Sequence, residues 1–226
     1  MARGQDGEAY DSEAMKERRR RILDEARALI AEHGVDGLTV AALGKRAGVA
    51  KQTLYYAFGS KDEIVAAAIL DYFETSEGKI DYRAAPGTLA RLIERMVAIV
   101  TRNLGIRNYI AALIAIWYGR SPVLWDALFD TASTSHRKVI AALVEQDALQ
   151  PWVQPDELIE TMVGQTILTT NAWLQGRIAD EDLIDRQVLA LMQLLAGVTR
   201  EPVRGEVERI AAAVRESGAK AYLASL

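Results

Sequence analysis

Residues 37–61, GLTVAALGKRAGVAKQTLYYAFGSK, constrain the fold of this 226-residue chain more than any other segment. They predict two short amphipathic helices joined by a tight turn. In the first helix, near 40–47, Val40 and Leu43 share one apolar face, and the hydroxyl of Thr39 suits the N-cap. Gly48 then supplies the backbone freedom that a tight turn between helices requires.

The second short helix is predicted from about Lys51 to 57. Leu54 and Phe58 lie four residues apart, which places both on its inward face. The remaining side chains then lie outside or at the rim, namely Lys51, Gln52, Thr53, Tyr55 and Tyr56. Two short helices around a glycine turn, with an outward face rich in hydrogen-bond donors, are typical of a helix-turn-helix.

The charge of this segment favours a polyanionic partner. It contains four cations and no acidic residue, in a chain whose net charge is −4. A phosphate backbone responds to this local positive field. A helical hairpin inside an ordinary all-α domain has the same periodicity, but it does not require Tyr55 and Tyr56 beside a basic surface. We therefore expect DNA binding.

The same residues form a longer motif. It consists of Thr39, Ala47-Gly48-Val49, Thr53-Leu54-Tyr55-Tyr56, Phe58 and Ser60-Lys61. This motif resembles the DNA-binding signature of TetR-family repressors. The resemblance implies an all-α fold of about nine to ten helices, with an N-terminal three-helix helix-turn-helix DNA-binding domain and a larger C-terminal helical ligand-binding and dimerisation domain. Two positions depart from the pattern: Ala57 stands where many relatives carry a DNA-contacting histidine, and Ala50 where a small hydroxyl residue is frequent.

The candidate DNA-binding residues follow from the motif and the charges. They are Thr39, Lys45, Arg46, Lys51, Gln52, Thr53, Tyr55, Tyr56 and Lys61. The N-terminal residues of a recognition helix usually reach base edges, so Gln52 suits adenine and Lys51 suits guanine or a phosphate. The tyrosine hydroxyls suit phosphate oxygens, although either ring alone has an even chance of being a core residue. By resemblance, Lys61 binds phosphate.

Residues 1–11 are polar and are predicted to be a disordered tail. Ser12 is expected to cap a first helix that reaches His33, with Gly34 ending it. The run Lys16–Arg21 contains five cations around Glu17. This run is either a solvated helix face or a basic arm that contacts phosphates or the minor groove.

A DNA-binding domain is predicted over 12–78, with the motif at about 38–57. Its last part is a linking helix over 61–77, which Ser60 and Glu63 begin as a capping box. A polar break follows, and the second domain is assigned to 79–226. Its helices are expected at about 88–104, 105–119, 122–147, 155–176, 180–197 and 203–223. The segment 106–118 is apolar nearly all round, which predicts burial in the centre of a bundle.

Dimerisation and a small-molecule effector are further expectations. By resemblance, 155–176 and 180–197 form a four-helix bundle with the same helices of a second copy, where Gly164 and Ala172 allow close approach. A mostly apolar effector is expected among aromatic and mid-helix polar residues. The candidates are Trp117, Tyr118, Trp125, Phe129, His136, Met162, Gln165, Thr166, Thr169 and Trp173. For any single one of these residues, the favoured explanation is core packing, a hydrogen bond across the dimer or, for His136, a satisfied buried histidine.

Other classes of protein have little support in the sequence. The chain has no cysteine and only two histidines, so neither a metal site nor a cofactor is expected. No phosphate-binding glycine loop, G-x-S-x-G or H-E-x-x-H motif indicates an enzyme. No segment reads as a signal peptide or membrane span, and a cytoplasmic protein is expected. The resemblance to TetR-family repressors implies a ligand-released repressor that binds a pseudo-palindromic operator as a homodimer. The alternatives are a helical scaffold with an acidic partner and, less favoured, an all-α enzyme with no recognisable motif.

Overall fold

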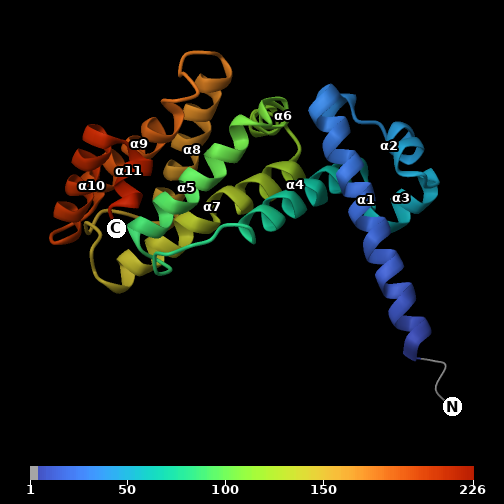
Figure 1. Ribbon diagram of the computed structural model, residues 1–226, viewed down its shortest axis with the longest axis horizontal. Helices are drawn as coiled ribbons and strands as arrows, with labels where there is room; N and C mark the ends of the chain where they lie inside the picture. The colour runs from blue at the N-terminus through green and yellow to red at the C-terminus, as the bar shows by residue number, and fades with distance from the viewer. Residues whose placement is uncertain (1–4) are drawn as a thin grey trace. The chain divides into compact units, whose positions relative to one another are not determined.

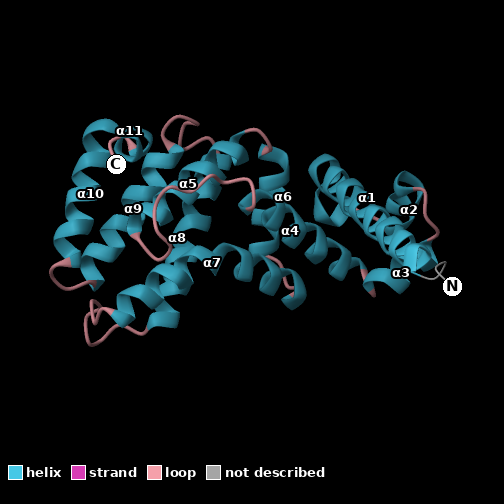
Figure 2. Cartoon of the chain, turned by 60° about the horizontal axis from the view of Figure 1, so that its bottom comes forward, coloured by secondary structure: helices cyan, strands magenta, loops and turns pink. Residues whose placement is uncertain are grey.

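The computed structural model describes residues 5–226, and the side chains from residue 14 onward. All regular secondary structure in residues 5–226 is α-helical (Figure 2). The helices are α1 (Gln5–Gly37), α2 (Val40–Ala47), α3 (Lys51–Phe58), α4 (Lys61–Glu77), α5 (Leu89–Leu104), α6 (Arg107–Trp117), α7 (Pro122–Glu145), α8 (Pro155–Leu174), α9 (Leu183–Val198), α10 (Val203–Ser217) and α11 (Ala219–Ala224). No helix in this part of the chain is long and apolar enough to cross a membrane.

These helices form two compact units (Figure 1). The first comprises Met1–Thr75 and Asn108–Leu128, and the second comprises Ser76–Arg107 and Phe129–Leu226. The first division therefore lies close to the predicted boundary at residue 78. Within the predicted second domain, 79–226, α6 and the start of α7 return to the first unit. This return depends on tertiary packing, which the linear order of helices does not reveal.

Helix α1 begins before the predicted start at Ser12, because Gln5 is already helical. The predicted disordered tail over 1–11 is thus wrong for residues 5–11, and residues 1–4 lie outside the described part of the chain. Glu8 and Ala9 favour helix in this segment, and no proline interrupts it. At the other end, Gly34 has φ of +73° and breaks the helical backbone, as predicted.

The core of the first unit includes the apolar stripe of α1 and the inward face of α4. Ile22 and Ile30 of α1 are buried, as are Ile64 and Ala68 of α4. The backbone N–H of Glu63 donates to Ser60 Oγ at 3.2 Å, which confirms the predicted cap. Helix α6 is not buried all round, since Ala111 and Ala115 are exposed. Alanine exposes little apolar area, so this face tolerates water.

The second unit is built on α5 and α8–α11. Helix α5 buries one stripe, which includes Leu92, Ile93 and Met96. Helices α8 and α10 both pack on α9. The single helix predicted over 203–223 is wrong, because Gly218 has φ of +86° and separates α10 from α11. Asp185 of α9 accepts a hydrogen bond from the backbone N–H of Ala219 at 2.9 Å, which fixes the start of α11.

Candidate DNA-binding surface

The turn between α2 and α3 has the predicted geometry. Thr39 Oγ1 accepts from the backbone N–H of Ala42 at 3.1 Å, and Gly48 adopts the left-handed conformation with φ of +66°. Sequence reasoning did not single out Gly44. A Cβ at this position would lie 2.9 Å from the backbone oxygen of Val49, so only glycine lets α2 approach the turn this closely.

Helix α3 has a narrow buried side and a wide polar one. Leu54 is fully buried, and Phe58 is half-buried. Lys51 and Gln52 are exposed at the start of the helix, while Thr53 is half-buried. The outward face predicted from the sequence is therefore present at the N-terminal end of α3, where base edges are usually contacted.

The two tyrosines of α3 lie at the surface. Tyr56 is 95% exposed, which excludes a core role for this ring, and Tyr55 is 42% exposed. The ammonium group of Lys51 lies 5.6 Å from the Tyr55 ring centroid, in cation–π contact. The ring of Tyr55 thus orients the lysine that opens the helix.

Three other predicted DNA-binding residues differ in whether their side chains already bond to groups of the protein. Lys45 of α2 is exposed. Lys61, the first residue of α4, is half-buried and donates from Nζ to the backbone oxygen of Asp36 at 3.4 Å. Thr39 is exposed, and its hydroxyl oxygen already caps α2. Of these residues, Lys45 is the one for which the structure gives no competing contact among the described residues.

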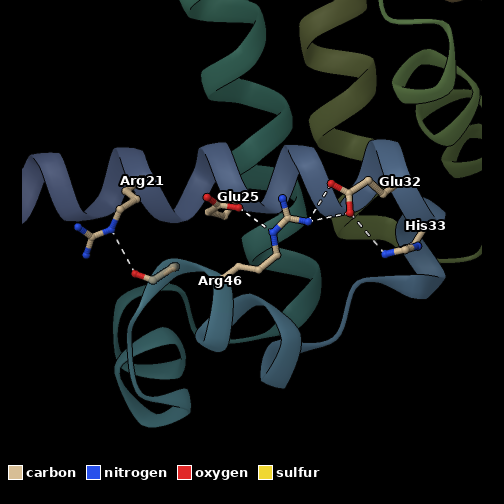
Figure 3. Close-up of polar contacts among 6 residues, drawn as sticks. Arg21, Glu25, Glu32, His33 and Arg46 are labelled. Carbon is tan, nitrogen blue, oxygen red and sulfur yellow. Dashed lines mark hydrogen bonds and ion pairs between the residues drawn. The ribbon is translucent and has the colours of Figure 1, made fainter.

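Arg46 is held by two carboxylates of α1 (Figure 3). Its Nε donates to Glu25 Oε2 at 2.8 Å, and its Nη1 donates to the two oxygens of Glu32 at 2.7 and 2.8 Å. The hydrogen bonds to Glu32 and Glu25 raise the pKa of Arg46, and the hydrogen bond from Arg46 lowers the pKa of Glu32. His33 Nε2 lies 3.5 Å from Glu32 on the same helix.

Two arginines of the basic run in α1 also contact the motif. The guanidinium of Arg19 lies 4.5 Å from the Phe58 ring centroid. Arg21 Nε donates to the backbone oxygen of Ala47, the last residue of α2, at 3.2 Å (Figure 3). Arg20 pairs with Glu17 of its own helix. The run is therefore more than a solvated face, since two of its members tie α1 to α2 and α3.

The residues predicted to bind an effector fall into both compact units. Trp117, Tyr118 and Trp125 belong to the first unit, and the other seven belong to the second. The Trp117 and Trp125 rings contact each other, with centroids 5.3 Å apart. Tyr118 is 63% exposed. Sequence order alone gave no sign of this division.

The polar residues of α8 bond within the second unit. The hydroxyls of Thr166 and Thr169 donate to the backbone oxygens four residues earlier, at 3.1 and 2.9 Å. Gln165 Nε2 donates to Thr169 Oγ1 at 3.2 Å. Gln187 of α9 donates to the hydroxyl of Thr170 at 2.9 Å. These groups need no ligand to satisfy their hydrogen bonds.

Trp173 is a core residue of the second unit. Its side chain is fully buried, and its Nε1 donates to Asp180 Oδ1 at 2.6 Å. The guanidinium of Arg107 lies 4.4 Å from the ring centroid and donates to the Trp173 backbone oxygen at 2.7 Å. This set of contacts explains the residue without an effector.

His136, Met162 and Phe129 differ in burial. Met162 is fully buried, His136 is buried, and Phe129 is half-buried beneath the guanidinium of Arg137, 5.7 Å from its ring centroid. Burial lowers the pKa of His136 to about 4, and the positive charge of Arg95 acts in the same direction. His136 is therefore neutral near pH 7. Among the described residues, no group of three or more side chains is arranged to hold a metal ion.

The face of α8 and α9 predicted to form a dimer has a surface hollow. Leu168, 58% exposed, lies at this hollow beside Ala172 of the same helix. Leu189 and Ala190 of α9 and Arg215 of α10 line it from the other side. An apolar side chain of this size, set beside other apolar groups, is consistent with a partner surface.

Comparison with known proteins gives consistent matches. Residues 22–68 match the family model for bacterial regulatory proteins of the tetR family. The chain is 29% identical over 203 residues to the HTH-type transcriptional repressor KstR of Rhodococcus jostii (strain RHA1), covering 84% of this chain and 89% of the relative. It is 23% identical over 194 residues to the repressor KstR2 of Mycobacterium tuberculosis (strain ATCC 25618 / H37Rv), covering 82% and 95%.

Solved structures share the fold. A TetR regulator from Streptomyces fradiae, TylP, matches with a TM-score of 0.62 at 20% identity, covering 90% of this chain and 98% of that one. FadR from Bacillus subtilis, solved in complex with stearoyl-CoA, matches with a TM-score of 0.57 at 18% identity, covering 79% and 98%. The helix-turn-helix geometry, the family match over that motif and the repressor relatives agree. This chain belongs to the TetR family and is a DNA-binding transcriptional regulator rather than an enzyme.

Proposed function

We propose that this regulator is a ligand-released repressor that binds a pseudo-palindromic operator as a homodimer. The observation that carries the proposal is the polar face of α3, where Lys51, Gln52 and Tyr56 are exposed on a helix held by a left-handed turn at Gly48. A binding surface needs polar groups that are free to meet a partner, and this face offers them at the end of the helix that enters the major groove. The curated relatives named as repressors support the direction of regulation.

The proposed roles follow the chemistry of the side chains. Gln52 presents both a donor and an acceptor, which matches the edge of adenine. Lys51 contacts guanine or a phosphate, and Thr53 lies at the rim beside them. Lys45 and the hydroxyls of Tyr55 and Tyr56 contact phosphates. Lys61 joins them by exchanging its weak 3.4 Å bond to Asp36 for a phosphate oxygen.

A homodimer formed through α8 and α9 would supply the two recognition helices that a pseudo-palindromic operator requires. Two recognition helices must meet successive major grooves about 34–36 Å apart, which a single chain with one motif does not achieve. Leu168, which is exposed beside this hollow, is the proposed contact for a two-fold partner. Gly164 supports close helix approach, because a Cβ there would meet no atom within 4 Å in the monomer.

The effector is proposed to be a mostly apolar small molecule. FadR, a neighbour in fold, was solved with stearoyl-CoA, which has a long apolar chain. Phe129, Met162 and His136 remain the better candidates in the second unit, since the polar groups of α8 already bond to one another. The effector lowers operator affinity by binding the DNA-incompetent state better than the DNA-binding state, by a few kcal/mol. A cytoplasmic location belongs to the same proposal, as an operator-binding protein works where the DNA is.

The test is selection of bound sequences from a library of random duplex DNA, with purified protein at physiological salt. The proposal predicts recovery of a palindrome whose half-sites are about one helical turn apart. Recovery of no motif, with binding that disappears as salt rises, contradicts it and favours the scaffold alternative. The recovered duplex then serves as the probe for a screen of apolar compounds that release the protein.

A further inference from the structure

We propose that Arg46 is a positioning residue, which holds α2 and, through α2, the recognition helix α3 against α1, instead of binding phosphate. The inference rests on the proposed function, because it assigns a role within DNA binding. It changes the expectation from the sequence, in which Arg46 was one of the phosphate-binding cations. The carboxylate partners of Arg46 on α1 carry the argument.

The geometry around Arg46 is that of a clamp between helices. Glu25 and Glu32 lie seven residues apart on α1, which places them on one face about two turns from each other. Arg46 reaches from α2 to both, with N–O distances of 2.8 Å to Glu25 and 2.7 Å to Glu32 (Figure 3). A guanidinium that binds two carboxylates through different nitrogens fixes direction as well as distance.

A second hydrogen bond strengthens the junction between α1 and the end of α2. Arg21 of α1 donates to the backbone oxygen of Ala47, which directly follows Arg46 and ends α2. The last carbonyls of a helix have no partner within the helix, so this bond satisfies one of them. The ion pairs of Arg46 and the bond from Arg21 thus act on the last two residues of α2, directly before Gly48, where the chain turns into α3. The orientation of α3 therefore depends on how this end of α2 is held.

Helix α3 has little packing of its own to set that orientation. It contains eight residues, and among them Leu54 alone is buried. Val49 N donates to the Gly44 backbone oxygen at 2.9 Å, which couples the turn to α2. A short helix with one buried side chain depends on its neighbours for position, and α2 is a neighbour in close backbone contact.

The local charge balance argues against a phosphate contact by Arg46. Its single positive charge lies between two carboxylates, so the trio has a net negative charge. Moving Arg46 to a phosphate would break both pairs and leave Glu25 and Glu32 without their cation near a polyanion. Lys45, the adjacent residue, is exposed and has no such carboxylates to release. Lys45 is therefore the cation that contacts DNA, and Arg46 is the cation that holds α2 in position against α1.

The first experiment compares Arg46→Gln with Lys45→Gln, its matched control of equal charge change on the same helix. The probe is the duplex selected by the wild-type protein, and affinity is measured over a range of salt. The clamp predicts that Arg46→Gln weakens binding about fivefold to tenfold with an unchanged salt slope. Lys45→Gln reduces the slope by about one. A drop of about one in the slope for Arg46→Gln assigns it to phosphate and overturns the inference.

The second experiment removes the partners of Arg46 and keeps its charge. If Arg46 binds phosphate, Glu25→Gln with Glu32→Gln frees it and strengthens DNA binding. The clamp predicts weaker binding than in the control, Glu17→Gln with Asp24→Asn. The control also removes two carboxylates seven residues apart on α1, but their ion pairs lie within that helix and do not touch the junction. Stronger binding than the control contradicts the clamp.

The same variants test whether the clamp acts as one unit. Once Glu25 and Glu32 have been replaced, Arg46 has lost both of its partners. The clamp therefore predicts that adding Arg46→Gln to the double variant has no further effect on affinity. A further loss of affinity, equal to that of Arg46→Gln alone in the wild-type protein, shows that Arg46 acts independently of the two carboxylates and overturns the inference.

A third readout needs no DNA and separates failure of the clamp from failure of the proposed function. The backbone N–H groups of Thr53 and Leu54 bond to the backbone oxygen of Ala50 at 3.0 and 3.3 Å. In the clamp variants these amides exchange with solvent several-fold faster, because α3 opens locally. Unchanged exchange in both Arg46→Gln and the carboxylate double variant overturns the inference. If the wild-type protein selects no DNA motif but exchange rises, the proposed function fails and the clamp stands.

Discussion

Helices α3 and α8 both carry runs of polar residues, but these residues are used in opposite ways. In α3, Lys51, Gln52 and Tyr56 are exposed. In α8, the side chains of Gln165 and Thr169 bond to each other and to their own helix. A polar residue on a helix therefore indicates a binding surface only when the rest of the fold does not already satisfy it. By this criterion α3 of the first unit has polar side chains available to a partner, whereas the polar side chains of α8 are part of a packed helical bundle.

The largest effect on stability is expected from replacing Trp173. This substitution tests whether the residue belongs to the core of the second unit or to an effector pocket. Trp173→Ala removes a fully buried ring together with its bond to Asp180, so it should reduce the free energy of unfolding by about 3–5 kcal/mol. Chemical denaturation of the variant measures the change. If stability is retained and only the response to effectors changes, Trp173 belongs to a ligand site, and α8 then presents binding residues as α3 does.

A smaller but still large effect is expected at Gly44. Gly44→Ala places a Cβ 2.9 Å from the Val49 backbone oxygen, and relief of this contact should reduce stability by about 1–3 kcal/mol and displace α3. Thermal unfolding and operator affinity are measured together. Gly197→Ala is the matched control, because a Cβ there meets nothing within 4 Å and α9 gains a better helix former. Equal operator affinity for wild type and Gly44→Ala would show that the close approach is not needed.

His136 predicts a pH effect in the second unit. Its pKa is lowered to about 4 in the folded protein, while an unfolded histidine titrates near 6.5. Below pH 6.5 the unfolded chain therefore binds more protons, and stability falls as pH decreases, by about 2 kcal/mol between pH 6.5 and 5. The free energy of unfolding measured across this window tests the prediction. His136→Gln should flatten the slope, and an equally steep slope in the variant would assign the effect to other groups.

A smaller effect on stability is expected from removing helix caps. Operator affinity is expected to change only when the cap lies in the first unit. Thr39→Ala and Thr88→Ala each remove a hydroxyl that accepts from a backbone N–H, at 3.1 Å in α2 and 3.2 Å in α5. Each should reduce stability by about 1 kcal/mol. Operator affinity of the folded protein should decrease for Thr39→Ala but not for Thr88→Ala, because α2 packs against the recognition helix α3. A decrease of similar size for Thr88→Ala would erase the distinction between the two units.

Local signals predicted the motif well. The caps at Thr39 and Ser60 and the turn at Gly48 depend on residues within four positions of each other, so spacing alone reveals them. The exposed start of α3 followed from the same periodicity. The break at Gly218 was missed, because a single glycine within an apolar helical pattern is often tolerated.

Contacts between distant residues were not accessible to this reasoning. Glu25 and Glu32 lie 21 and 14 residues before Arg46, and nothing in the spacing pairs them with it. The sequence therefore predicted a free cation where the fold has a clamped one. For the same reason, aromatic residues such as Trp173 looked like pocket candidates until their neighbours were known, since cores and pockets share composition.

The central claim is that the exposed face of α3 reads DNA bases, and Gln52 tests it most directly. Selection from random duplex DNA would be run in parallel with the wild-type protein and Gln52→Ala. Our account predicts that both recover the same palindrome, but that the variant loses preference at one position of each half-site, a discrimination of about 1–3 kcal/mol. Identical preferences at every position would contradict it and place the recognition surface elsewhere on the molecule.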